Sequence, residues 1–216
     1  KNKILITATV FATAFFLQSC GNGNNSTVKN ETDTSMSQMA QTDTMMDMNK
    51  MGNSMMQSMN GTMGKMNDMK MTGDFDLDFA NMMMMHHQAA IDMSEVEVAK
   101  GTDTEIKTMA QNIITAQKAE IEQMQQFVKN YKMPQAKPGH AEMHNELAET
   151  MKMMQDTLMG IKMSGNPDKD FVLMMVPHHE SAVTMAEDEL HHGKSLEMKK
   201  LAQRIMISQK KEIMDF

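Results

Sequence analysis

The feature that most constrains this chain is an internal repeat. Shifting the sequence by 92 residues aligns Asp78–Met124 with Asp170–Phe216 without a gap, and 20 of the 47 aligned positions are identical. In each copy a glycine, Gly101 or Gly193, separates two segments with helical periodicity. The repeat therefore predicts a duplicated helical hairpin. Two such hairpins joined by a long connection pack as a four-helix bundle with a pseudo-twofold axis.

Hydrophobic periodicity and helix-breaking residues predict an all-α fold, because no stretch shows the alternation that is typical of a strand. We expect helices near residues 75–100, 103–131, 140–163, 168–191 and 194–214. The predicted domains are a signal peptide at 1–20, a polar tether with a Met-rich segment at 21–73, and a bundle at 74–216. Within the bundle the repeats span 74–131 and 167–216, and the connector between them carries an extra helix.

The N-terminus resembles a bacterial lipoprotein signal. Lys1 and Lys3 precede a short apolar run, which ends at Leu17-Gln18-Ser19-Cys20-Gly21. The run is too short for a comfortable membrane span, and Cys20, the only cysteine, stands where a lipid would be attached. The alternative is a plain secretory signal with a chance cysteine. We expect a lipid-anchored protein of the bacterial cell envelope, facing the periplasm, whose soft-metal ligands are Met or His.

Methionine dominates the apolar composition, with 33 residues against no tryptophan and one tyrosine. Met fills cores loosely, and its thioether is also a soft ligand that selects soft metals such as Cu(I). The formal charge of −7 disfavours a nucleic-acid partner, so we expect none.

The segment before the repeats carries a stripe of methionines. After a polar tether at 21–35, these residues recur at steps of three and four and share one helical face: Met45, Met48, Met51, Met55, Met59, Met63, Met66 and Met69. Two compatible interpretations stay open. The stripe packs an amphipathic helix on the core, or it forms a metal-collecting arm. Gly52, Gly61 and Gly64 argue against a stable free helix.

Each repeat places two thioethers and an imidazole on one helical face. At 100° per residue, His86 lies about 40° and Met93 about 20° from Met82. The second copy repeats this arrangement with Met174, His178 and Met185. Small residues between these positions leave room for an ion, so each face offers the donors of a low-coordinate Cu(I) or Ag(I) site.

A neighbouring face carries His87 and His179, with Met83 and Met175 one turn before them. These residues form a second site or cap the first, and the alternative of ordinary structural histidines stays open. Weaker candidates are His140 with His144, and the pair His191-His192. Pro177 should bend its helix just before His178.

The pattern Phe171-x-x-Met174-Met175-Val-Pro-His178-His179-x-x-Ala182-x-x-Met185-Ala186, with the looser copy from Phe79 to Met93, resembles the signature of the domain-of-unknown-function 305 family. The resemblance covers roughly residues 74–216 and implies a ferritin-like four-helix bundle. Some members are periplasmic copper-binding proteins that use Met and His. The metal ligands implied by position are Met82, Met83, His86, His87, Met93, Met174, Met175, His178, His179 and Met185.

These observations predict a non-enzymatic envelope protein that holds copper as Cu(I), or Ag(I), for sequestration or for relay to a copper efflux or chaperone protein. One alternative is a ferritin-like di-metal carboxylate enzyme. Such a site needs Glu-x-x-His on two helices, and Glu189-x-x-His192 has only Glu97-x-x-Lys100 as its counterpart. The other alternative is a non-catalytic structural lipoprotein.

Overall fold

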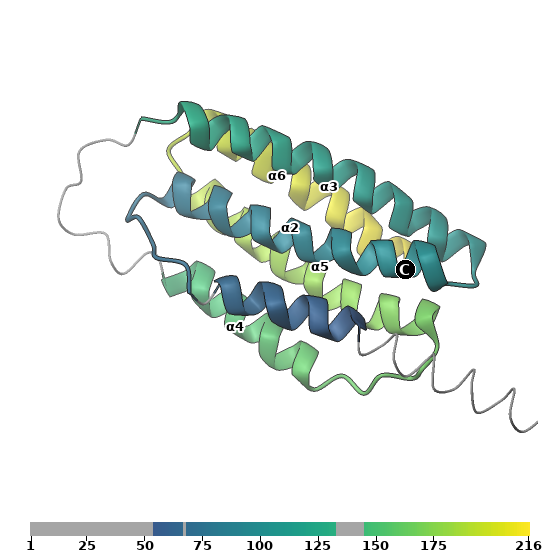
Figure 1. The fold of residues 1–216 in the computed structure, drawn as a ribbon. Helices are drawn as coiled ribbons and strands as arrows, with labels where there is room; N and C mark the ends of the chain where they lie inside the picture. Colours follow the sequence, from purple (N-terminus) through teal and green to yellow (C-terminus); the bar gives the residue numbers. More distant parts are fainter. Residues whose placement is uncertain (1–53, 67, 133–144) are drawn as a thin grey trace, which may run out of the picture.

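The computed structural model of the protein describes residues 54–66, 68–132 and 145–216, and the regular elements in these ranges are all helices. Figure 1 labels α2 (Phe75–Lys100), α3 (Thr104–Asn130), α4 (Asn145–Met159), α5 (Pro167–His192) and α6 (Leu196–Asp215). A further helix at 54–66 precedes α2. The all-α prediction is confirmed, and the four helices of the repeats begin and end within two residues of their expected bounds. The helix expected at 140–163 ends earlier, at Met159, and its expected start lies outside the described residues.

Side-chain caps determine where the helices begin. An oxygen of each capping side chain accepts a hydrogen bond from a backbone N–H of the first turn, which would otherwise lack a partner. The caps are Asp74 for α2, Asp103 for α3, Asn166 for α5 and Ser195 for α6. Pro167 adds a preset backbone angle at the first position of α5.

The two hairpins form the bundle. α2 packs against α3 and α5 against α6, and the hairpins meet where α2 contacts α5. α4 packs on α5, and the helix at 54–66 is tied to α2 by a 2.9 Å hydrogen bond from Ser58 to Asp92. Figure 1 shows these two shorter helices on the side of the bundle away from α3 and α6. The four-helix bundle of two duplicated hairpins is therefore confirmed.

The duplicated unit extends beyond the hairpin. The helix at 54–66 and α4 are 92 residues apart, and each precedes a turn whose glycine has positive φ, 84° at Gly73 and 80° at Gly165. Asp78 and Asp170 accept matching hydrogen bonds from these turns. Buried apolar residues keep the same register in both helices: Met55 with Leu147, Met59 with Met151, and Met66 with Leu158. The extra helix of the connector is thus the counterpart of the helix at 54–66.

Carboxylates tie each repeat to the other. Asp76 on α2 accepts hydrogen bonds from the two backbone N–H groups just before α6, and Asp168 on α5 accepts from those just before α3, at 2.7–2.9 Å. Both carboxylates are buried. This reciprocal exchange connects the N-terminal ends of α2 and α5 to the opposite hairpin, and so fixes how the two long helices cross.

A glycine at the end of each long helix makes room for a second carboxyl group. A Cβ on Gly101 would overlap the carboxyl of Glu97, and a Cβ on Gly193 would overlap that of Glu189. Both glycines have negative φ, so close approach rather than backbone freedom explains them.

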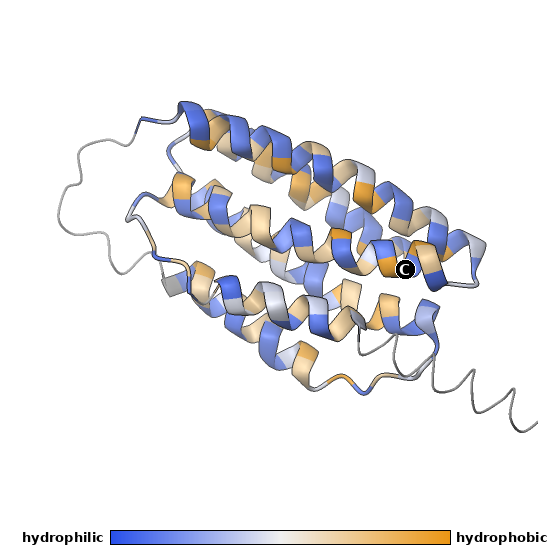
Figure 2. Cartoon of the chain, viewed as in Figure 1, coloured by the Kyte–Doolittle hydropathy of each residue, from blue (hydrophilic) through white to orange (hydrophobic). Residues whose placement is uncertain are grey.

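Methionine supplies much of the core, including Met55, Met59, Met63 and Met66 of the N-terminal stripe, which are at most 5% exposed. These four residues therefore pack as core, while Met45, Met48 and Met51 lie outside the described residues. Figure 2 shows that the visible face of α3 is largely hydrophilic. No helix in the described part of the chain is both long enough and apolar enough to span a membrane.

Candidate metal centre

Two histidines meet at the pseudo-twofold axis, where α2 crosses α5. The ring centroids of His86 and His178 lie 3.6 Å apart, with 32° between the ring planes, and both side chains are fully buried. The small buried residues Ala89 and Ala90 on α2, with Ser181 and Ala182 on α5, allow this close approach. The fold therefore brings two sequence positions 92 residues apart into direct contact.

All ten predicted ligands are buried, and none is more than 3% exposed. The six predicted methionine ligands belong to the one hydrophobic core cluster of the bundle, namely Met82, Met83, Met93, Met174, Met175 and Met185. Pro177 lies inside α5 without ending it. The predicted thioether and imidazole donors therefore all lie in the interior of the bundle, away from bulk solvent.

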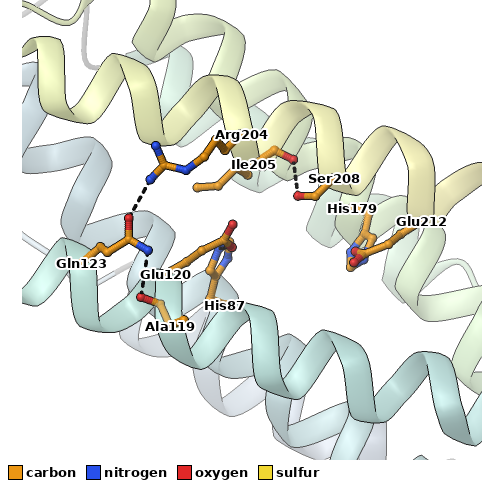
Figure 3. Close-up of polar contacts among 9 residues, drawn as sticks. All are labelled: His87, Ala119, Glu120, Gln123, His179, Arg204, Ile205, Ser208 and Glu212. Atoms are coloured by element: carbon orange, nitrogen blue, oxygen red, sulfur yellow. Dashed lines mark hydrogen bonds and ion pairs between the residues drawn. The ribbon is translucent and has the colours of Figure 1, made fainter. Parts of the chain in front are cut away.

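His87 and His179 point away from the axis, toward carboxylates of the outer helices. His87 Nε2 lies 2.7 Å from Glu120 Oε2 of α3, and His179 Nε2 lies 2.7 Å from Glu212 Oε2 of α6. Figure 3 shows the two pairs at separate places between the helices. The sequence interpretation did not identify these carboxylates, although Glu120 and Glu212 are identical in the 92-residue alignment.

Several ring nitrogens are buried without a hydrogen-bond partner among the described residues. They are Nδ1 of His86, His87, His178 and His179, Nε2 of His178, and Nε2 of His179, which lies 2.7 Å from Glu212 Oε2 without the geometry of a hydrogen bond. A buried polar atom left unpaired costs about 1–3 kcal/mol. Polar atoms kept at such a cost in a core point to a ligand that they would bind.

Burial also sets the protonation state of the central pair. Desolvation lowers the pKa of His86 and of His178 well below the ordinary value, and the neighbouring histidines lower both further. Both rings are therefore neutral at pH 7. A neutral imidazole offers a lone pair to a metal ion, whereas a protonated one does not.

Ser181 joins the histidine pair to α4. Its Oγ lies 2.8 Å from His86 Nε2, 2.8 Å from the sulfur of Met154 and 2.7 Å from the carbonyl oxygen of His178. Met154 is 3% exposed and was not among the predicted ligands. The repeat does not mark Met154 as a ligand, because the corresponding residue of the first repeat is Thr62 and not a second methionine.

No three His, Cys, Asp or Glu side chains of the described residues lie together in a group that would hold a metal ion. Glu189 lies beside Asp76, and His192 pairs with Glu146 of α4 at 2.8 Å. His140 and His144 lie outside the described residues.

The model of a protein family described as "Domain of unknown function (DUF305)" matches residues 76–216. No curated protein matches the chain. Among solved structures, a DUF305 protein from Streptomyces coelicolor is 23% identical with a TM-score of 0.51, and the match covers 67% of this chain and 89% of that one. This likeness shows a shared fold.

A second match is CopM in its silver-bound form, which is 34% identical with a TM-score of 0.48. The match covers 64% of this chain and 90% of CopM. CopM structures have also been solved in apo, Cu(II)-bound and Cu(I)-bound forms.

Proposed function

This chain belongs to the DUF305 family, and from that premise we propose that it binds copper as Cu(I), and Ag(I) in its place, through methionine and histidine side chains between α2 and α5. CopM, a relative that is 34% identical over 90% of its length, has been solved with silver and with copper bound. That relationship supports copper as the metal class.

The observation that carries the proposal is the pair of fully buried imidazoles in close contact inside a methionine-rich core. Their unpartnered nitrogens are a cost in the metal-free protein, and metal bonds would offset it. A purely structural core would gain stability from apolar residues of the same volume at these positions.

The donor set favours Cu(I) over Cu(II). The buried donors at the axis are neutral imidazoles and thioethers, and thioethers are soft ligands that suit a monovalent soft ion. A divalent ion is costlier to bury, because the desolvation penalty rises steeply with charge. The buried carboxylates Asp76 and Asp168 are engaged with backbone N–H groups elsewhere in the bundle.

Complete burial favours sequestration over rapid exchange. The central histidines have no exposed surface, so an ion enters or leaves only when side chains or helices move apart. Relay to a copper efflux or chaperone protein would need a partner that promotes this opening.

Competition titration tests the proposed metal. The purified chain is titrated with Cu(I) under anaerobic conditions against bicinchoninate, and in parallel with Zn(II). We expect Cu(I) to bind far more tightly than Zn(II), because thioethers are poor ligands for a harder ion. Equal affinities for the two ions would contradict the proposal.

We further propose that the protein is anchored to the cell envelope by a lipid on Cys20, after cleavage of the signal segment just before this cysteine, and faces the periplasm. The support is the signal-like sequence that ends at this cysteine. Cys20→Ala should move the protein out of the membrane fraction. Unchanged membrane association of that variant would exclude the lipid anchor.

A further inference from the structure

The symmetry of the site is broken on one side. Ser181 and Met154 contact the His86 side of the central pair. The positions 92 residues earlier hold Ala89 and Thr62, neither of which offers a thioether. Accordingly, His86 Nε2 has a partner, whereas His178 Nε2 has none among the described residues.

We propose that Met154 Sδ and His86 Nε2 are ligands of one soft metal ion, and that the Ser181 hydroxyl holds these two atoms together while the ion is absent. The inference rests on the proposed copper binding and adds to it a ligand from α4. It also assigns the nitrogen through which His86 binds.

The distances support a shared ion. The nitrogen and the sulfur each lie 2.8 Å from the same oxygen, so they are at most about 5.6 Å apart. Metal bonds of about 2.0 Å to nitrogen and about 2.3 Å to sulfur, as found for zinc, would span about 4.3 Å at most. A movement of roughly 1 Å by the flexible Met side chain closes the difference.

The hydroxyl suits the role of a temporary partner. It is able to donate to the thioether while it accepts from the imidazole N–H, so it satisfies two buried groups at once. A thioether is a weak hydrogen-bond acceptor, so a soft ion displaces the hydroxyl from it readily. The displaced hydroxyl keeps a partner, because the carbonyl oxygen of His178 lies 2.7 Å away.

Met151 provides a matched control for Met154. Both residues are on α4, both are buried, at 2% and 3% exposure, and no hydrogen bond joins Met151 to Ser181 among the described residues. Replacing either by Leu roughly conserves volume, so the packing cost should be similar. Only Met154→Leu removes the proposed ligand.

The test measures Cu(I) affinity by bicinchoninate competition for the parent, Met154→Leu and Met151→Leu. We expect Met154→Leu to weaken binding by about tenfold or more, the loss of about 1.4 kcal/mol, while Met151→Leu binds like the parent. Equal affinities for the two variants would overturn the assignment. A parent that binds no Cu(I) would instead refute the proposed function itself.

Two further measurements keep the proposal testable if Met154→Leu folds poorly. In the parent labelled with methyl-¹³C methionine, Ag(I) should shift the Met154 signal and leave Met151 unchanged; the opposite result would refute the ligand. Ser181→Ala should bind Cu(I) as tightly as the parent or more tightly, because no hydroxyl has to be displaced. A tenfold or greater loss in Ser181→Ala would show that Ser181 is itself required for binding.

Discussion

At the scale of single residues, the carboxylates beside His87 and His179 determine which ring nitrogen faces the core. His87 Nε2 is hydrogen-bonded to Glu120 Oε2 at 2.7 Å, and a proton on this nitrogen would leave Nδ1 as a lone-pair donor; Glu212 Oε2 lies as close to His179 Nε2, without the geometry of a hydrogen bond. Nδ1 of both histidines is buried without a partner among the described residues. A carboxylate that orients an imidazole in this way is a common feature of metal sites.

The double variant Glu120→Gln with Glu212→Gln tests this orientation. Metal affinity falls by about 10–100-fold when such an outer partner is lost, and we expect a weakening of this order for Cu(I) in competition titration. The control is Glu95→Gln with Glu187→Gln, which removes the same charge from exposed ion pairs with Lys118 and Lys210. If both double variants weaken binding equally, the effect is one of net charge and not of orientation.

Met93 and Met185 test whether thioethers bind the metal or only fill the core. Both are fully buried, and replacement by Leu costs less than about 1.5 kcal/mol in most cores. We expect the Met93→Leu, Met185→Leu variant to fold normally, by circular dichroism, and to bind Cu(I) about tenfold more weakly or worse. Parent-like Cu(I) affinity would show that these two residues are core and nothing more.

The site residues that could be predicted from the sequence are those that occur at the same position in both repeats. His86 and His178 stand out because each copy carries them at the same helical position. Met154 is different, since its contact with Ser181 spans two helices and its counterpart, Thr62, has another chemistry. Helical periodicity predicts which residues of one helix share a face, but it does not predict which residue of a neighbouring helix contacts that face.

At the scale of elements, a pair of carboxyl groups lies at the end of each long helix. Burial, together with the adjacent Asp168, raises the pKa of Glu97 from 4.5 to about 8. Burial and the adjacent Asp76 raise the pKa of Glu189 from 4.5 to about 9. Both glutamates are therefore mainly protonated in the folded protein at pH 7, beside the carboxylates that tie the two repeats together.

Stability should consequently fall as the pH rises toward 9. The unfolded chain releases these protons near pH 4.5, whereas the folded protein keeps them to about pH 8 and 9. Between these values the folded state binds more protons, so the free energy of unfolding decreases with pH and then levels off. The contribution is complete only below about pH 4.5, where both states are protonated.

The variant Glu97→Gln with Glu189→Gln should flatten this dependence, because an amide has the size of the protonated acid and does not ionise. We expect the free energy of unfolding of this variant at pH 9 to exceed that of the parent by at least roughly 1 kcal/mol, since one pKa unit corresponds to 1.36 kcal/mol. Urea unfolding at pH 6 and pH 9 measures the difference. A variant whose stability declines as steeply as that of the parent would contradict the raised pKa values.

The elements themselves were largely predictable, for local reasons. Asp74, Asn166 and Ser195 start helices through bonds to their own first turns, and such contacts are visible in a sequence. The sequence does not determine where the helix at 54–66 packs, because a stripe of methionines suits both a core and a free arm. Its burial depends on α2, and only the three-dimensional structure shows that contact.

At the scale of the whole molecule, the proposed site lies between the repeats, so an ion bound there would join the two halves. Binding to the folded state alone adds about 2.7 kcal/mol when free ligand is 100 times the dissociation constant. For a domain of this size that corresponds to a rise in Tm of roughly 5–10 °C. We expect this rise when Ag(I) is added to the purified protein in a thermal scan.

The control for the thermal scan is His86→Ala with His178→Ala. This variant loses the central ring nitrogens, so its Tm should not respond to Ag(I). Its metal-free stability should fall only modestly, because the removal of buried, unpaired polar atoms offsets part of the cost of the cavity. An equal Tm rise in the parent and the variant would place silver elsewhere on the protein.

The paired histidines on the axis also bear on how this chain could have arisen. A homodimer of one three-helix unit would place identical residues on both sides of its twofold axis and would build the same central pair from two separate chains. Fusion of the two copies keeps them at a fixed one-to-one ratio and removes the dependence of assembly on concentration. Fusion also allows each half to change independently of the other. Ser181 and Met154 in the second half correspond to Ala89 and Thr62 in the first. A symmetric dimer of identical chains has the same residue at both positions, so it cannot carry such a difference.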